Sequence, residues 1–174
     1  MDEENLIQAL KNGDISAVDE IYRAYSAPAL RTAYLMTSDR HTAEDVLQDT
    51  FIQCIKSING LKNNSAFKAW FYKILVRNAY KAEKAQKSLI PSEDIYEKAD
   101  TAVYDKYPSE KSEIISCINR LPQKLRSTVI LFYYNELTIK EISQIMLCPQ
   151  GTVKSRLDRA KKELKKFIEK EKLL

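Results

Sequence analysis

Residues 138–164 read TIKEISQIMLCPQGTVKSRLDRAKKEL, and this stretch decides the fold of the second half of the chain. Apolar residues recur at helical spacing on both sides of a short break, which predicts two helices joined by a tight turn. Thr138 and Glu141 form the T-x-x-E pattern of a capping box, which marks the start of the first helix. The residues expected to face the core are Ile139, Ile142 and Ile145, then Val153, Leu157, Ala160 and Leu164. The stretch therefore predicts a helix-turn-helix.

The second of these helices carries a basic surface away from its apolar stripe. A recognition helix places its N-terminal residues against base edges and the flanking phosphates, where Arg, Lys and Ser are suitable side chains. The residues predicted to contact DNA are Thr152, Lys154, Ser155, Arg156, Arg159 and Lys162. An amphipathic helix with a solvated basic face would carry the same charges. The capped helix and tight turn before it favour DNA.

Charge is segregated along the 174 residues, although the net charge is only +4. Counted from the sequence, residues 1–49 have net charge −6, residues 50–87 have +7, residues 88–110 have −4 and residues 111–174 have +7. Two basic blocks separated by an acidic one indicate a polyanion that is contacted at two places. Chance clustering in a Lys-rich protein is the competing interpretation.

Several classes of protein are disfavoured. No apolar run approaches a membrane span, and the acidic start does not resemble a signal peptide, so a cytoplasmic protein is expected. Cys54, Cys117 and Cys148 are widely spaced and the only histidine is His41, which predicts buried free thiols without disulfides or zinc. No glycine-rich phosphate loop or nucleophile motif is present. We therefore expect no enzyme activity, no cofactor and no small-molecule substrate.

The first half predicts a helical bundle. Helices are expected at about 3–12, 15–27, 28–37, 42–58 and 66–85, with Asp14 and Ser65 as N-caps, Thr42 at the start of the fourth and Pro28 as a break. Asp45 completes a capping-box pattern with Thr42. The apolar stripes expected to be buried are Ile15, Val18, Ile21, Tyr22 and Tyr25 in the second helix, and Val46, Phe51 (or Leu47), Cys54 and Ile58 in the fourth.

Residues 88–110 have no helical stripe, two prolines and many acidic residues, which is typical of a linker. The fold expected is therefore all-α, with two small helical domains at 1–87 and 111–174 joined by an acidic linker at 88–110.

Both halves resemble the extracytoplasmic-function (ECF) sigma factors of bacterial RNA polymerase. TAEDVLQDTF resembles the region 2.2 signature, and FKAWFYKILVRN resembles regions 2.3 and 2.4. INRLPQKLRSTVILFYYNELTIKEISQIM and GTVKSRLDRAKKEL resemble region 4, whose last helix reads the −35 promoter element. The resemblance covers about 10–87 and 111–168, with two unrelated signatures in the family's order.

The resemblance implies an alternative sigma factor that binds core RNA polymerase at the β′ clamp and the β flap and recognises promoter DNA. The residues it places on the clamp are Glu44, Asp45, Gln48 and Asp49, whose acidic surface would repel phosphate. Asp45 also suits a helix-capping role. The resemblance further implies an anti-sigma factor, anchored in the membrane, as a regulator. It also implies that the acidic linker threads through the polymerase cleft.

The helix after residue 65 is expected to contact the −10 element. Phe67, Trp70, Phe71, Ile74 and Asn78 fall on one face, expected to be the core, while Tyr72, Val76 and Tyr80 lie roughly opposite, near Lys73 and Lys84. Aromatic rings between cations suit single-stranded DNA, although core packing competes for each aromatic. By resemblance, the loop at 61–66 forms the pocket for a flipped base. The −10 residues predicted are Asn63, Asn64, Ser65, Tyr72, Lys73, Arg77, Asn78, Tyr80 and Lys84.

Two positions depart from the family pattern. Ala82 stands where Asp is frequent, which puts promoter melting or −10 sequence choice in doubt. Leu147 stands where the turn often has Gly, which predicts a turn that is either strained or shaped differently. The alternative functions are a free-standing helix-turn-helix repressor or activator, which would need a dimer helix, and a helical interaction module without DNA. The polymerase-docking signature in the first half favours the sigma factor.

Overall fold

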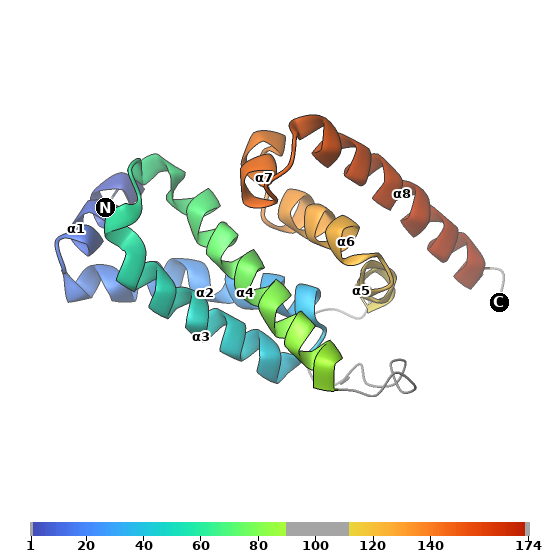
Figure 1. The fold of residues 1–174 in the computed structure, drawn as a ribbon, viewed down its shortest axis with the longest axis horizontal. Coiled ribbons are helices and arrows are strands. Elements are labelled where there is room, and N and C mark those ends of the chain that lie inside the picture. Colours follow the sequence, from blue (N-terminus) through green and yellow to red (C-terminus); the bar gives the residue numbers. More distant parts are fainter. Residues whose placement is uncertain (1, 90–111, 173–174) are drawn as a thin grey trace.

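The computed structural model describes residues 2–89 and 112–172, and within these ranges all regular structure is helical, which confirms the all-α prediction (Figure 1). The first half contains α1 (Glu3–Lys11), α2 (Ile15–Thr37), α3 (Arg40–Ser57), two short 3-10 turns (Ile58–Gly60 and Asn64–Ala66) and α4 (Phe67–Leu89). The second half contains α5 (Ser112–Asn119), α6 (Gln123–Val129), a π-helical turn (Ile130–Tyr134), α7 (Ile139–Ile145) and α8 (Gln150–Lys172). Residues 90–111, which include most of the predicted linker at 88–110, lie outside the described residues, so the linker remains a prediction.

The first half is organised around an aromatic cluster between α2, α3 and α4. The ring of Phe71 lies 5.1 Å from Tyr25 and 5.2 Å from Phe51, and Phe67 meets Tyr25 edge to face at 5.2 Å. Tilted and edge-to-face pairs at these distances add specific attraction to the burial of apolar area. The predicted α3 stripe of Val46, Phe51, Cys54 and Ile58 is buried here, together with Leu47.

Three helix boundaries differ from the prediction. Pro28 does not end the second helix, because α2 continues to Thr37 and Pro28 lies on its exposed side, where water can reach the carbonyl that loses its N–H partner. Asp39, and not Thr42, caps α3, since its carboxylate accepts the Thr42 N–H at 2.8 Å. Asn63, and not Ser65, caps the turn before α4 by accepting the Ser65 N–H at 3.1 Å.

The predicted stripe on the second helix is wrong at two positions. Ile15 is 80 % exposed and Tyr22 is 51 % exposed, while Ile21 is buried and Val18 and Tyr25 are partly buried. Ile15 is the first residue of α2, where no neighbouring helix covers it. The Tyr22 ring packs against Phe51 at a tilt of 49°, with 4.9 Å between centroids, while it remains exposed on its other side.

In the second half, α7 and α8 form the predicted helix-turn-helix. The capping box is present, with the Thr138 N–H donating to Glu141 Oε2 at 2.8 Å and the Glu141 N–H donating to Thr138 Oγ1 at 3.2 Å. Ile142, Ile145, Val153, Leu157 and Ala160 are buried as predicted. Residues 123–134 form the short α6 and the π-helical turn that follows it.

The two halves are packed against each other and share one hydrophobic core. Helix α4 lies between α2 and α3 on one side and α7 on the other, as Figure 1 shows. The apolar cluster that contains Phe67, Phe71 and Leu75 of α4 continues without interruption to Ile142, Val153 and Leu157. Helix α4 is therefore covered on the side that faces α2 and α3 and on the side that faces α7.

Within the described residues, no helix combines the length and the apolar character that crossing a membrane requires.

The three cysteines differ in their expected reactivity. Cys54 and Cys117 are buried, Cys148 is partly buried, and burial raises the pKa of the Cys54 thiol to about 12. Because only the thiolate is nucleophilic, and a pKa of about 12 leaves about one Cys54 thiol in ten thousand ionised at pH 8, we expect iodoacetamide to modify Cys148 alone in the native protein. Mass spectrometry should show one adduct, and three adducts in 6 M guanidinium. Modification of Cys54 in the native state would contradict this burial.

Candidate DNA and polymerase interfaces

The predicted −35 residues lie on α8, on the side that does not pack against α6 and α7. Lys154, Ser155, Arg159 and Lys162 are exposed, while Thr152 and Arg156 are partly buried. The helix is oriented by Val153, Leu157 and Ala160, which are buried beneath it. The structure therefore brings the six residues onto one helix surface, with Arg156 at its inner edge.

Arg156 marks the border between this surface and the rest of the protein. Its Nη1 donates to the Cys148 sulfur at 3.5 Å, which ties the first turns of α8 to the preceding turn. Burial raises the pKa of the Tyr80 phenol on α4, and the nearby positive charge of Arg156 partly offsets this rise. Arg156 is thus shared between the −35 surface and the contact with the first half.

A groove beside α8 adds a residue that sequence reasoning missed. The start of α6 lies next to Ser155, Arg156 and Arg159, and the groove between them is also lined by Lys124. Lys124 is exposed, and its ammonium group extends the basic surface of α8. No single-helix pattern indicates this, because α6 and α8 meet only in the folded chain.

The turn between α7 and α8 is strained, as the departure from glycine predicts. Leu147 has φ of 49° and is 75 % exposed. The left-handed conformation brings a Cβ too close to the backbone, and only glycine adopts it without this clash. The exposed leucine side chain makes little packing that could compensate for the strain.

We expect Leu147→Gly to increase the free energy of unfolding by about 0.5–1 kcal/mol, because relief of the left-handed strain exceeds the entropy that glycine gains in the unfolded chain. Leu147→Ala keeps the strain and serves as the control, with an expected change of less than about 0.5 kcal/mol. Urea unfolding measures both. A loss of stability in both variants would show that the leucine side chain contributes packing, and a loss in Leu147→Gly alone would show that the entropy of glycine in the unfolded chain exceeds the strain.

The predicted base pocket, the loop at residues 61–66, is held by its own hydrogen bonds and by α1. Asn63 and Ser65 are exposed, and Asn63 Oδ1 accepts from Ser65 Oγ at 2.9 Å. Asn64 is partly buried, and its side chain bonds to α1 through Lys11 Nζ at 2.7 Å. The three residues therefore lie together, but Asn64 points toward α1.

Of the two interpretations of Tyr72, Val76 and Tyr80, stacking on DNA or core packing, this arrangement favours core packing. Tyr72 and Val76 are buried, and Tyr80 is partly buried with its hydroxyl bonded to Ser127 Oγ at 2.9 Å. The second half of the chain covers this face. Asn78 is also buried and donates to Thr50 Oγ1 at 3.2 Å.

The open face of α4 carries cations and one aromatic ring instead. Arg77, Lys81 and Lys84 are exposed, Lys73 and Trp70 are partly exposed, and all five lie three or four residues apart. Trp70 packs against Phe67, with 6.1 Å between ring centroids, at the end of α4 nearest the 61–66 loop. Of the predicted −10 residues, Lys73, Arg77 and Lys84 thus share an accessible surface, and Trp70 joins them.

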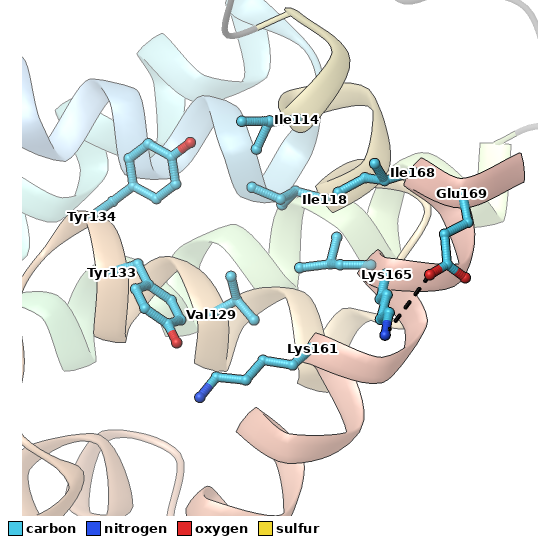
Figure 2. A pocket seen from close by; sticks show the side chains of 10 residues that line it. Ile114, Ile118, Val129, Tyr133, Tyr134, Lys161, Lys165, Ile168 and Glu169 are labelled. Atoms are coloured by element: carbon cyan, nitrogen blue, oxygen red, sulfur yellow. Dashed lines mark ion pairs between the residues drawn. The ribbon is translucent and has the colours of Figure 1, made fainter. Parts of the chain in front are cut away.

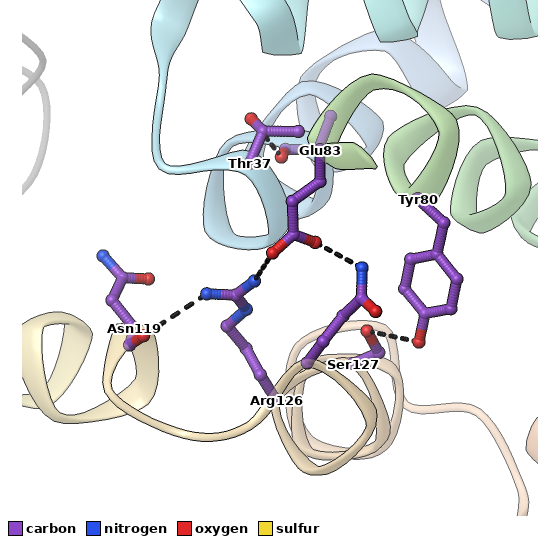
Figure 3. A network of polar contacts seen from close by, with 8 residues as sticks. Thr37, Tyr80, Glu83, Asn119, Arg126 and Ser127 are labelled. Carbon is purple, nitrogen blue, oxygen red and sulfur yellow. Dashed lines mark hydrogen bonds and ion pairs between the residues drawn. The ribbon is translucent and has the colours of Figure 1, made fainter. Parts of the chain in front are cut away.

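A polar network bridges α4 and α6 where the halves meet (Figure 3). Glu83 Oε1 accepts from Arg126 Nη2 at 2.9 Å, and its other oxygen accepts from the Gln123 amide. The side chains of Arg126 and Glu83 are only 10 % and 13 % exposed. Arg126 also donates to the Asn119 carbonyl at 3.3 Å, so the guanidinium holds three elements together.

A second buried contact joins α2 to the π-helical turn. Asn135 Nδ2 donates to Thr32 Oγ1 at 2.8 Å, and the Thr32 hydroxyl donates to the Pro28 carbonyl at 2.9 Å. Burial raises the pKa of the Tyr72 phenol. Its hydrogen bonds with the same two side chains lower that pKa by a smaller amount. The Thr32, Tyr72 and Asn135 side chains of this second contact are thus paired with one another, whereas Arg126 Nε and Asn119 Oδ1 in the first network are buried without a hydrogen-bond partner among the described residues.

The predicted polymerase-binding residues lie on the exposed side of α3. Glu44, Asp45, Gln48 and Asp49 are all exposed, and Glu44 is paired with Arg40 at 2.9 Å. The competing role for Asp45, an N-terminal cap, belongs to Asp39. Sequence reasoning missed Ile52 and Ile55, which are 42 % and 41 % exposed and extend this surface with apolar area. Their spacing from Glu44 and Gln48 could have indicated a shared face.

An open apolar groove lies on the second half, between α5, the π-helical turn and α8 (Figure 2). It is lined by Ile114, Ile118, Val129, Tyr133, Tyr134, Lys161, Leu164, Lys165, Ile168 and Glu169. Lys165 and Glu169 form an exposed ion pair at its rim, at 3.8 Å. The groove offers an apolar surface distinct from the basic residues at the start of α8.

Comparison with known proteins matches two family models to the chain. Residues 21–89 match "Sigma-70 region 2", and residues 111–164 match "Sigma-70, region 4". Both matches are to parts of one class of protein, the sigma-70 factors of RNA polymerase.

Curated relatives match over nearly the whole chain. The ECF RNA polymerase sigma-E factor of Haemophilus influenzae is 30 % identical over 94 % of both chains. The ECF RNA polymerase sigma factor SigM of Bacillus subtilis is 34 % identical over 85 % of this chain and 93 % of its own length. The chain belongs to the ECF RNA polymerase sigma factors.

Solved structures share the fold. CnrH in complex with the cytosolic domain of CnrY superposes with a TM-score of 0.77, 16 % identity and coverage of 96 % of this chain and 97 % of that chain. The sigma factor RpoE in complex with the anti-sigma factor NepR from Bartonella quintana gives a TM-score of 0.70, 21 % identity and coverage of 87 % and 96 %.

Proposed function

We propose that this alternative sigma factor binds core RNA polymerase through α3 and reads the −35 and −10 promoter elements through α8 and α4. The observation that carries the proposal is the distribution of surfaces on one fold. An acidic and apolar face on α3 is separate from two basic faces on α4 and α8. Phosphate repels the first and is attracted to the other two. The proposed role is binding, without catalysis, in the cytoplasm.

At the −35 element, the first three turns of α8 enter the major groove and Lys124 of α6 contacts the flanking phosphate. Arg159 and Lys154 have exposed side chains that can reach base edges, where Arg pairs with guanine through two hydrogen bonds. Lys124 lies beside them in the groove next to α8. Base contacts set the promoter sequence and the phosphate contact sets the orientation.

At the −10 element, the loop at residues 61–66 receives a flipped base, and the basic open face of α4 follows the single strand. Lys73, Arg77 and Lys84 neutralise phosphates, and Trp70 offers a ring for stacking at the end nearest the loop. Tyr72 and Tyr80 can join only after the second half moves away from α4, because both are covered by it here.

The polymerase occupies two surfaces of the chain. We assign the β′ clamp to the α3 face, where Ile52 and Ile55 add apolar contact to the acidic residues. We assign the β flap to the apolar groove beside α5 and α8, because the basic start of α8 is occupied by DNA. We also propose control by a membrane-anchored anti-sigma factor. The family of the chain supports this, as does a fold shared with a sigma factor solved with the anti-sigma factor NepR.

Run-off transcription with purified core polymerase, with and without the chain, tests the proposal on genomic fragments. Core-dependent transcripts from specific start sites support it and give the −35 and −10 sequences. Tight duplex binding by the chain alone, without transcripts, would instead support the free-standing repressor.

Ile52→Glu with Ile55→Glu should abolish core binding, while Ile15→Glu, which changes an exposed isoleucine on α2, serves as the matched control.

A further inference from the structure

The loop at residues 61–66 is anchored to α1, a helix that precedes the region 2 match at residues 21–89. Lys11, the last residue of α1, donates from Nζ to the Leu61 carbonyl at 2.6 Å and to Asn64 Oδ1 at 2.7 Å. It therefore holds the loop at two points, one on the backbone and one on a side chain. Two of the three ammonium donors are used in this way.

Both polar atoms of the Asn64 side-chain amide form hydrogen bonds with residues of α1. Its oxygen accepts from Lys11, and its nitrogen donates to the Glu4 carbonyl at 3.2 Å and approaches Gln8 Oε1 at 3.4 Å. A side chain whose donor and acceptor are both engaged has little left for a nucleobase. Asn64 therefore links the loop to α1, whereas Asn63 and Ser65 remain exposed at the loop surface.

Helix α1 is itself fixed in place and can serve as a rigid support. Leu6, Ile7 and Leu10 are buried in the shared core, and the Glu3 carboxylate accepts a hydrogen bond from the Tyr25 hydroxyl. The Lys11 stem is partly buried, which limits the number of rotamers its ammonium can explore. The contact from Lys11 to the loop thus connects a packed helix to an otherwise exposed turn.

We infer that Lys11 is a positioning residue for −10 recognition, which holds the 61–66 loop, through Leu61 and Asn64, in the conformation that receives a base. The inference rests on the proposed role of this loop as the base pocket. Asn63 is then the side chain in the loop that contacts the base, and Asn64 is not. Precise positioning matters because small displacements of a binding group cause large losses.

The test uses the full chain with core polymerase and promoter templates that carry each of the four bases at each −10 position. Asn63→Ala first identifies the position that the loop reads, as the one where the base preference changes. Lys11→Met, which keeps the stem and removes the donors, should reduce the preference at that same position by about tenfold. Core affinity and the dependence on the −35 sequence should stay unchanged. Lys11→Arg, which keeps a cationic donor, should restore part of the preference.

Two further variants separate positioning from charge. Asn64→Leu should reproduce the effect of Lys11→Met, and the double variant should show no further loss, because both remove one linked contact. Lys62→Met is the matched control: Lys62 is an exposed lysine in the same loop, and its loss should lower transcription equally for all four bases.

The outcomes distinguish the inference from the function on which it rests. If Asn63→Ala changes the preference but Lys11→Met lowers all four templates equally, or leaves them unchanged, Lys11 has no positioning role. If no −10 position responds to Asn63→Ala, the loop is not the base pocket, whatever Lys11 does. Circular dichroism and urea unfolding of each variant identify any that fail to fold, in which case Lys11→Arg and Asn64→Leu decide.

Discussion

Arg126→Met should lower the free energy of unfolding by about 3 kcal/mol, because it removes the ion pair and hydrogen bond that Arg126 makes with the Glu83 carboxylate in a nearly buried site. The ion pair between them is 2.9 Å long, and both side chains are about nine-tenths covered. Methionine keeps the apolar volume of the arginine stem, so the loss reports the charge and its hydrogen bonds. Urea or thermal unfolding of the full chain gives the value.

Two comparisons make this expectation specific. Glu83→Gln combined with Arg126→Met should recover much of the stability, since both charges of the buried pair are then removed together. Lys165→Met removes the exposed pair with Glu169 and should change stability by less than about 0.5 kcal/mol. Equal effects of Arg126→Met and Lys165→Met would mean that water reaches the Glu83 site.

Arg159→Ala should weaken recognition of the −35 element by about 1–3 kcal/mol, which is about 5- to 150-fold, if its guanidinium reads a base. The loss should fall on the preferred −35 sequence and be small for a scrambled one. Arg159 is exposed on α8 and makes no contact that α8 needs for folding, so stability should be unchanged. Run-off transcription on the two templates measures the ratio.

Lys124→Ala provides the contrast on the same surface. A phosphate contact from Lys124 predicts an equal loss on both templates and a salt dependence that is shallower by about one unit. Lys170→Ala, at the exposed far end of α8, is the control and should match the wild type. If Arg159→Ala lowered transcription equally on both templates, Arg159 would be a phosphate contact and not a base contact.

Local patterns predicted the helix-turn-helix well, because its determinants lie within one short stretch. The capping box of Thr138 and Glu141 and the buried positions Val153, Leu157 and Ala160 are as expected. The αL conformation of Leu147 also follows from a turn that requires positive φ. These features depend on residues three to five apart, which the sequence displays directly.

The face of α4 could not be predicted in the same way. Helical periodicity separates the side of Phe67 and Phe71 from the side of Tyr72, but it does not show that a distant helix covers the second side. The structure buries Tyr72 through contact with residues more than fifty positions later in the chain. The role of Asn64 was missed for the same reason, since its partners lie on α1.

The core shared by the two halves has a consequence for the whole molecule. Because apolar contacts run without a break from α2 and α4 to α7 and α8, neither half can lose its packing without exposing that of the other. Calorimetry should therefore record one melting transition, with equal calorimetric and van't Hoff enthalpies. A partner that binds the two halves apart from each other must contribute enough binding free energy to offset the loss of this contact. The apolar area buried between the halves thus determines both how cooperatively the chain unfolds and how much binding free energy such a partner must contribute.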